Sequence, residues 1–211
     1  TLQATGTGGT LALGANDVSG AGVTLEGVGV TQSSGSTVDA GSGDILVDGG
    51  AGAINMAGAL TTTSDTATAT TVQDASTVTL PAITTGSTGT TTIGAGDITG
   101  AVTQSPSTVI STGTLTGDTT SSVDLGNGNT IPTLGAFTSD GFTLDDDGAL
   151  SLSGTVSGST GSVTLQATGT GGILALGTNN VSGAGVTLEG VGVTQSSGST
   201  VDAGSGDILV D

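Results

Sequence analysis

Residues 1–48 read TLQATGTGGTLALGANDVSGAGVTLEGVGVTQSSGSTVDAGSGDILVD, and residues 164–211 repeat them with only three substitutions. The substitutions replace Thr10 by Ile173, Ala15 by Thr178 and Asp17 by Asn180. Such close self-similarity at a fixed offset indicates a repeat architecture. We therefore expect one continuous rod over residues 1–211, with a repeat unit of 1–163 and a second copy that begins at 164. We also expect the chain to be part of a longer tandem array.

The apolar residues come in short alternating pairs bounded by Gly, Ser, Asn and Asp, which is the pattern of β-strands and turns. No window has a convincing helical period, and a glycine every few residues would penalise a helix by about 1 kcal/mol each. The pairs are Leu11/Leu13, Val23/Leu25, Val28/Val30, Ile54/Met56, Val78/Leu80, Leu150/Leu152 and Val163/Leu165. The sequence therefore predicts an all-β fold.

A second, longer spacing connects these pairs. The strand openings lie near Thr24, Ile45, Thr71, Thr92, Thr143 and Thr164, with one irregular stretch between Thr92 and Thr143. Elsewhere they recur with a spacing of about 21–26 residues, the coil length of a parallel β-helix in which each coil stacks on the previous one. We expect seven or eight coils in the unit and nine or ten in the chain.

Two other folds compete with the β-solenoid. A hairpin sandwich would need two-residue Asn-Gly or Asp-Gly turns at every second strand. Such turns occur only irregularly, at Asn127, Asp48, Asp140 and Asp147. Disorder is the other alternative, given 41 glycines. The regular Val, Ile and Leu pairs argue against it, because disordered chains are poor in these residues.

The substitutions between the copies indicate which side chains point inward. Thr10, which becomes Ile173, has the opposite parity to Leu11 and Leu13. An outward position accepts either residue, whereas a packed position would not. We therefore expect Leu11 and Leu13 in the core. The run Ile45 to Val47 leaves its inward parity open.

The charge composition excludes several partners. The chain has no Lys, Arg or His and carries 18 acidic residues, so its formal net charge is −18. Nucleic acid binding needs cationic side chains, and an anionic membrane surface would repel the chain. No apolar run approaches the roughly 18 residues that a membrane span needs. Cations must therefore come from solvent or from a partner.

The stretch from Asn129 to Val156 carries a family resemblance. Its phrase TIPTLGAFTSDGFTLDDDGALSLSGTV, together with GSVTLQATGTGG at 161–172, resembles the shaft repeats of filamentous-haemagglutinin-like exoproteins. These are large secreted adhesins of Gram-negative bacteria, and the resemblance implies a right-handed parallel β-helix exported through an outer-membrane partner. The family's Asn-Pro-Asn secretion motifs and its Arg-Gly-Asp adhesive motif do not occur here. The resemblance therefore supports a shaft and leaves a binding tip without a counterpart in this chain.

Catalysis is poorly supported, and we expect no enzyme. Without His, Cys or Lys, only carboxylates and hydroxyls remain as acids, bases and nucleophiles. Two phenylalanines, Phe137 and Phe142, are the only aromatic residues that could hold a sugar beside a carboxylate pair.

Calcium is the better chemical hypothesis, and no other cofactor is indicated. Asp145, Asp146 and Asp147 form the only acidic run, and Ca²⁺ prefers six to eight oxygen ligands. The segment 41–50, GSGDILVDGG, also contains one imperfect copy of the calcium-binding Gly-Gly-x-Gly-x-Asp nonapeptide. The alternative for the acidic residues is turn formation and solubility, with screening by diffuse cations.

Two further motifs are weaker. Thr-x-Thr pairs at 66–68, 112–114 and 168–170 suggest the hypothesis of ice binding, but an ice-binding face needs the same pair on every coil. A single coil-length step connects only Thr70, Thr91 and Thr112, so strand propensity and threonine ladders explain them better. Asn180-Val181-Ser182 is a glycosylation sequon, but the other copy has Asp17 in place of Asn180.

The sequence as a whole predicts an acidic, secreted rod at the bacterial cell surface, the structural shaft of an adhesin-like filament. Further copies of the repeat, in the same chain or end to end, are the expected partners. A cell-surface or glycan receptor would bind through regions outside these residues. The alternatives are a segment of a self-assembled fibre or sheath without adhesive role, and a calcium-dependent rod.

Overall fold

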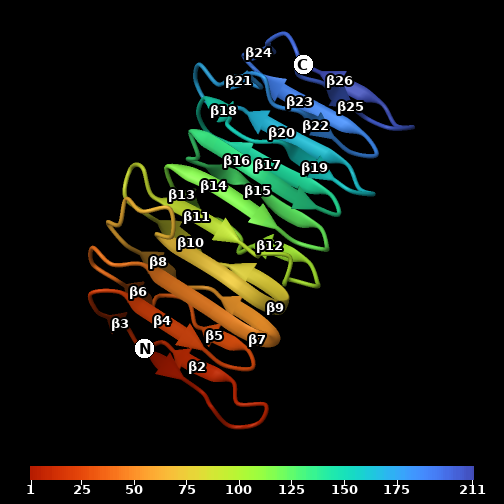
Figure 1. Cartoon of the computed structure of the whole chain (residues 1–211). Helices are drawn as coiled ribbons and strands as arrows, with labels where there is room; N and C mark the ends of the chain where they lie inside the picture. Colours follow the sequence, from red (N-terminus) through yellow and green to blue (C-terminus); the bar gives the residue numbers. More distant parts are fainter.

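The computed structural model describes all 211 residues and contains strands but no helix. Most strands are short, and they pair in parallel and stack as about ten coils of a β-solenoid whose N- and C-termini lie at opposite ends (Figure 1). All-β architecture and the parallel solenoid are thus confirmed. Each coil carries three strand segments, and the register of equivalent segments defines three faces.

Face 1 begins with β1 (Leu2–Gln3) and β4 (Val23–Glu26) and continues through the first halves of two long strands, β7 (Ile45–Met56) and β9 (Thr70–Leu80). It then runs through β11 (Thr90–Ile93), β14 (Thr114–Asp118) and β16 (Thr133–Ser139). Val47, Val72 and Ile93 are stacked inside this face.

Face 2 spans the whole rod and has ten rungs. They are β2 (Leu11–Gly14), β5 (Val30–Gln32), the second halves of β7 and β9, β12 (Val102–Gln104), β15 (Val123–Asn129), β17 (Phe142–Asp146), β20 (Val163–Ala167), β23 (Val186–Gly190) and β26 (Ile208–Val210).

Steps between equivalent positions on successive rungs of face 2 measure the coil length. The longest steps include that from Val30 to Ile54, and the shortest are those from Leu11 to Val30 and from Val123 to Phe142. The longest steps agree with the predicted coil length. The shortest coils are slightly shorter than predicted.

Face 3 is a separate sheet of five strands: β3 (Val18–Ser19), β6 (Thr37–Asp39), β8 (Ala59–Thr61), β10 (Ala82–Thr84) and β13 (Ile110–Ser111). A single bridge from Ser111 to Thr130 is its last rung. Beyond that point face 1 divides. One half continues as β18 (Leu150–Leu152), β21 (Ile173–Ala175) and β24 (Gly192–Thr194). The other half continues as β19 (Val156–Gly158), β22 (Val181–Ser182) and β25 (Val201–Asp202).

The core is a thin apolar column in which Val, Ile and Leu from successive coils stack, and 40 buried residues form one connected cluster. Leu13 is 6% exposed and Leu11 is partly buried against the cluster, whereas Thr10 and Ile173 are exposed, so the predicted parity of this strand is confirmed. The open case is also decided: Ile45 and Val47 are buried, and Leu46 points outward between Thr24 and Thr71.

One predicted strand pair is wrong. Val30 is buried in β5, but Val28 is 43% exposed. Gly29 between them has a φ of 98°, a conformation that favours glycine and marks a corner. The chain turns there, so the alternation of Val28 and Val30 does not belong to one strand.

The second copy lies one face further round the rod than the first. Leu2 belongs to face 1, but its copy Leu165 belongs to face 2. Seven rungs of face 2 separate Leu11 from Val163. The repeat unit 1–163 thus contains seven coils and one additional face.

This offset explains the irregular spacing between Thr92 and Thr143. Thr92 lies on face 1, where Thr116 is its next neighbour, and Thr143 lies on face 2, paired with Asp124. The two threonines belong to different ladders. Their separation therefore does not measure a whole number of coils.

Candidate functional site: the acidic strand and the polar core beside it

The acidic run does not converge on one point. Asp145 points outward in β17 and accepts a hydrogen bond of 2.8 Å from Thr168 Oγ1 on the next coil. Asp146 points inward and is 1% exposed, whereas Asp147 follows the strand and is exposed. Strand alternation separates these carboxylates, and no group of three or more acidic side chains is arranged to hold a metal ion.

Asp146 instead satisfies backbone donors in the interior. Its Oδ1 accepts a hydrogen bond of 2.5 Å from the Ile131 N–H. Burial raises the pKa of Asp146 to about 6. The hydrogen bonds from the N–H groups of Ile131 and Gly148 oppose this rise, while the charges of Asp145 and Asp147 add to it. A carboxylate without a cation is costly in such a place, and the raised pKa expresses that cost.

Asn129 has the same role one coil earlier. Its Oδ1 accepts hydrogen bonds from Ile110 N at 2.9 Å and from Gln104 Nε2 at 2.8 Å. Its Nδ2 donates to the Leu125 carbonyl at 2.9 Å, and the residue is fully buried. Ile110 opens β13, and Ile131 follows the last bridge of face 3, so Asn129 and Asp146 supply side-chain acceptors for backbone N–H groups where this sheet ends.

Asn129 and Gln104 are not among the residues that the sequence predicts to form a site. A signal does exist for the glutamine, because VTQS occurs at 30–33, 102–105 and 193–196. In each case the glutamine Nε2 donates to the carbonyl four residues later, namely Ser36, Thr108 or Ser199, at 3.1, 2.8 and 3.0 Å. The motif thus closes a corner of the coil. Nothing local distinguishes Asn129 from any other turn asparagine.

Asp44, in the segment with the nonapeptide-like spacing, is surrounded by hydroxyls. Ser64 and Thr66 donate to its Oδ1 at 2.6 and 2.8 Å, and Thr68 donates to its Oδ2 at 2.7 Å. Hydrogen bonds from Ser64, Thr68 and Thr66 lower the pKa of this carboxyl against the opposing effect of burial. The carboxylate therefore links two coils through side chains of the chain itself.

Other acidic side chains connect successive coils at the corners. Asp17 Oδ1 accepts the Thr37 N–H at 2.8 Å, and in the second copy Asn180 Oδ1 accepts the Thr200 N–H at the same distance. The substitution of Asp17 by Asn180 therefore keeps the acceptor. Asp140 accepts from the hydroxyl and the N–H of Thr160, which lowers the pKa of Asp140.

The threonines connected by one coil-length step do not form a surface. Thr70 and Thr91 are fully buried and Thr112 is 4% exposed. Thr91 donates to Thr112 Oγ1 at 3.1 Å, while Thr70 Oγ1 has no hydrogen-bond partner. This set of threonines therefore belongs to the interior and offers no face for ice.

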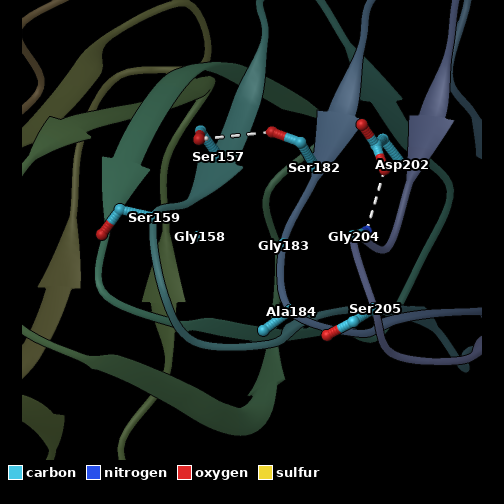
Figure 2. A pocket seen from close by; sticks show the side chains of 9 residues that line it. All are labelled: Ser157, Gly158, Ser159, Ser182, Gly183, Ala184, Asp202, Gly204 and Ser205. Atoms are coloured by element: carbon cyan, nitrogen blue, oxygen red, sulfur yellow. Dashed lines mark hydrogen bonds between the residues drawn. The ribbon is translucent and has the colours of Figure 1, made fainter.

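The surface is hollowed only by shallow grooves. One, of about 320 Å³, crosses the outer side of β19, β22 and β25 (Figure 2). Ser157 and Ser182 point toward each other there, with a hydrogen bond of 3.3 Å, and Asp202 accepts the Gly204 N–H at 2.9 Å. Its walls otherwise consist of Gly, Ser and Ala, without an aromatic or cationic side chain to hold a ligand.

Comparisons with protein-family models, with curated proteins and with solved structures gave no match. None of the structure is helical, and it therefore holds no helix that could cross a membrane. The fold and the arrangement of these side chains define a repetitive parallel β-solenoid.

Proposed function

We propose that the chain is a structural shaft segment of a secreted, repetitive bacterial surface protein, similar to the filamentous-haemagglutinin-like adhesins, and that it is not an enzyme. The observation that carries the proposal is the use made of the polar side chains. Asp17, Asp44, Asp140, Asp146 and Asn129 all bond to neighbouring coils or to chain backbone. These groups hold the coils together along the rod, which is a mechanical role.

The resemblance of residues 129–156 to shaft repeats supports the extracellular setting, and so does the composition. Without Lys or Arg the chain has no trypsin cleavage site, which suits a protein outside a cell. Eighteen negative charges keep such a rod soluble and separate from anionic surfaces. A receptor, cell-surface or glycan, would then be bound by another part of the protein.

Immunogold labelling of intact cells that produce the protein tests this proposal. Antibodies against residues 129–156 should label filaments outside the envelope, in rows along each filament. Label found only after the cells are opened would contradict the surface location. A sample that shows compact particles in place of elongated rods would contradict the shaft.

A self-assembled fibre without adhesive role is the second candidate. Successive coils are joined by parallel backbone ladders, such as that between Val186–Leu188 of β23 and Ile208–Val210 of β26, and coils of separate chains could stack in the same way. Open strand edges accept further strands. If deletion of other parts of the protein abolishes cell adhesion and leaves the filaments intact, the adhesin shaft is favoured. If the cells carry filaments but show no adhesion at all, the fibre is favoured.

A further inference from the structure

The nearly identical sequences of the two copies occupy different faces of the rod, and this offset has a local cause. Val18 of the first copy stacks on Val38 in face 3, whereas its copy Val181 pairs with Val156 in the continuation of face 1. The offset therefore arises between the copies, in the part of the unit that is not repeated here.

The strands where face 1 divides show how the offset arises. Leu115 and Gly117 in β14 are two positions apart, and their partners Leu134 and Phe137 in β16 are three apart. On the next coil the partners of those residues, Leu152 and Val156, are four apart. One residue is thus added per coil until a new corner stands between β18 and β19. At the same coils face 3 ends at Thr130.

Residues 129–147 make this change of cross-section possible, and we name them the junction. Asn129 and Asp146 bond the N–H groups of Ile110 and Ile131, which would otherwise lose their partners. Phe137 and Phe142, the only aromatic residues, are buried there and stack with ring centroids 4.3 Å apart. The junction therefore removes one face and opens another, and each later strand moves by one face.

We propose that every repeat unit turns the next one by one face, so that three consecutive units present any surface encoded by the unit in three directions. This inference rests on the proposed function as a tandem rod. Three units contain 22 coils, after which the original face returns. At about 4.8 Å per coil, equivalent patches lie roughly 35 Å apart along the axis, and patches with the same direction roughly 105 Å apart. A partner that binds such a patch could therefore approach the rod from any of three directions.

The chain permits a matched test because it contains no cysteine. Thr31 and Thr194 are equivalent in the two copies but lie on different faces. Thr31 pairs with Asn55 on face 2, whereas Thr194 pairs with Ala175 in the continuation of face 1. Thr187 occupies the same ladder position on face 2 as Thr31, seven rungs further along the rod. Nitroxide labels on two introduced cysteines would therefore report the offset.

Pulsed electron paramagnetic resonance should give a distance of about 34 Å between the nitroxides of the pair Thr31→Cys with Thr187→Cys, because seven rungs of about 4.8 Å separate the two positions. The pair Thr31→Cys with Thr194→Cys should give a distance longer by about 5–10 Å, since the second label projects from another side of a rod whose facing sheets are about 10 Å apart. Equal distances for the two pairs would overturn the inference. A broad distribution in the Thr187 control would instead contradict the rigid rod, and so the proposed function.

A chain of four units extends the test to the array. With Thr31→Cys repeated in every unit and labelled with biotin and streptavidin, electron microscopy should show the first and fourth labels on one side, roughly 105 Å apart. The second and third labels should project in other directions. Four labels on a single side would overturn the proposal even where the rod itself is seen.

Discussion

Neighbouring side chains of this rod differ in whether they point into the core or into solvent. Leu13 is packed in the core, while Thr10, on the same segment, is exposed and donates to the Val28 carbonyl at 3.3 Å. Asp146 is the one acidic side chain in the interior, and its carboxylate accepts the Ile131 N–H beyond the last bridge of face 3. Residue-scale changes should therefore differ sharply between neighbouring positions.

Leu13→Asp should lower the unfolding free energy by about 3–5 kcal/mol, because it buries an unpaired charge. Thr10→Asp is the matched control and should change the stability by about 0.5 kcal/mol or less, because that side chain is in water. Urea unfolding of both variants measures the difference. Equal tolerance of the two substitutions would show that the parity of this strand is misassigned.

The titration of Asp146 should give the rod an unusual dependence on pH. Its pKa in the folded chain, about 6, is above the usual 3.8, so the folded state holds this proton more tightly than the unfolded state does. The contribution of Asp146 to stability is therefore largest below pH 4, falls as the pH rises from about 4 to about 6, and is constant above that. A shift of this size corresponds to about 3 kcal/mol.

Asp146→Asn removes this titration. Most of the shift is expressed between pH 4.5 and 7.5, so the loss of unfolding free energy across that range should be about 2 kcal/mol smaller than in the parent chain. Asp39→Asn, at the exposed end of β6, controls for the removal of one charge. A pH dependence of Asp146→Asn that is parallel to that of the parent would mean that the buried carboxyl is not what titrates.

At the scale of the element, β17 and the residue after it combine an outward, an inward and a following carboxylate in one acidic run. Asp145 is bonded to Thr168 and Asp146 to the backbone of Ile131. A calcium ion would have to take these oxygens from their present donors. Calcium binding at this strand therefore requires that the ion compete successfully with the hydrogen bonds that Asp145 and Asp146 already accept.

If Asp145, Asp146 and Asp147 bind calcium, millimolar CaCl₂ should raise the melting temperature beyond NaCl of the same ionic strength, because the ion binds only the folded state. The double variant Asp145→Asn/Asp147→Asn should lose that additional rise. Calorimetry of both chains in both salts is the measurement. The same melting temperature in the two salts would leave only screening and would contradict a specific site.

At the scale of the whole molecule, two opposing effects control the association of chain ends: open strand edges favour pairing, and negative charge opposes it. The first and last coils of the 211-residue chain present unpaired backbone groups, and its 18 acidic residues repel a second copy. Salt reduces this repulsion, since the screening length is about 10 Å at 0.1 M. Salt should therefore control association between ends.

The isolated 211-residue chain should form end-to-end fibres at moderate salt and fewer of them at low salt. Sedimentation across a series of NaCl concentrations, at fixed protein concentration, measures the fraction assembled. A folded monomer that persists at high salt and high protein concentration would mean that the end coils are protected from pairing. Such a result would weaken the description of the chain as a rod that stacks on further copies.

The sequence by itself determined the class of fold and much of its interior. The alternation of Leu11 and Leu13, the change of Thr10 to Ile173 and the recurrence of strand openings suffice for a parallel solenoid, because burial acts on each strand locally. The candidate site was less predictable. A run of three aspartates has the composition of a cation site, but only the strand direction shows that Asp146 points into the core.

The tertiary structure alone decided which face each copy occupies. Residues 1–48 and 164–211 have nearly the same local preferences, so their sequences predict the same strands and turns but not the strands beneath them. Those neighbours are supplied by the preceding coil, through backbone bonds between residues one coil apart. Since the junction at 129–147 changes the preceding coils, Leu2 and Leu165 end on different faces for a reason that neither copy contains.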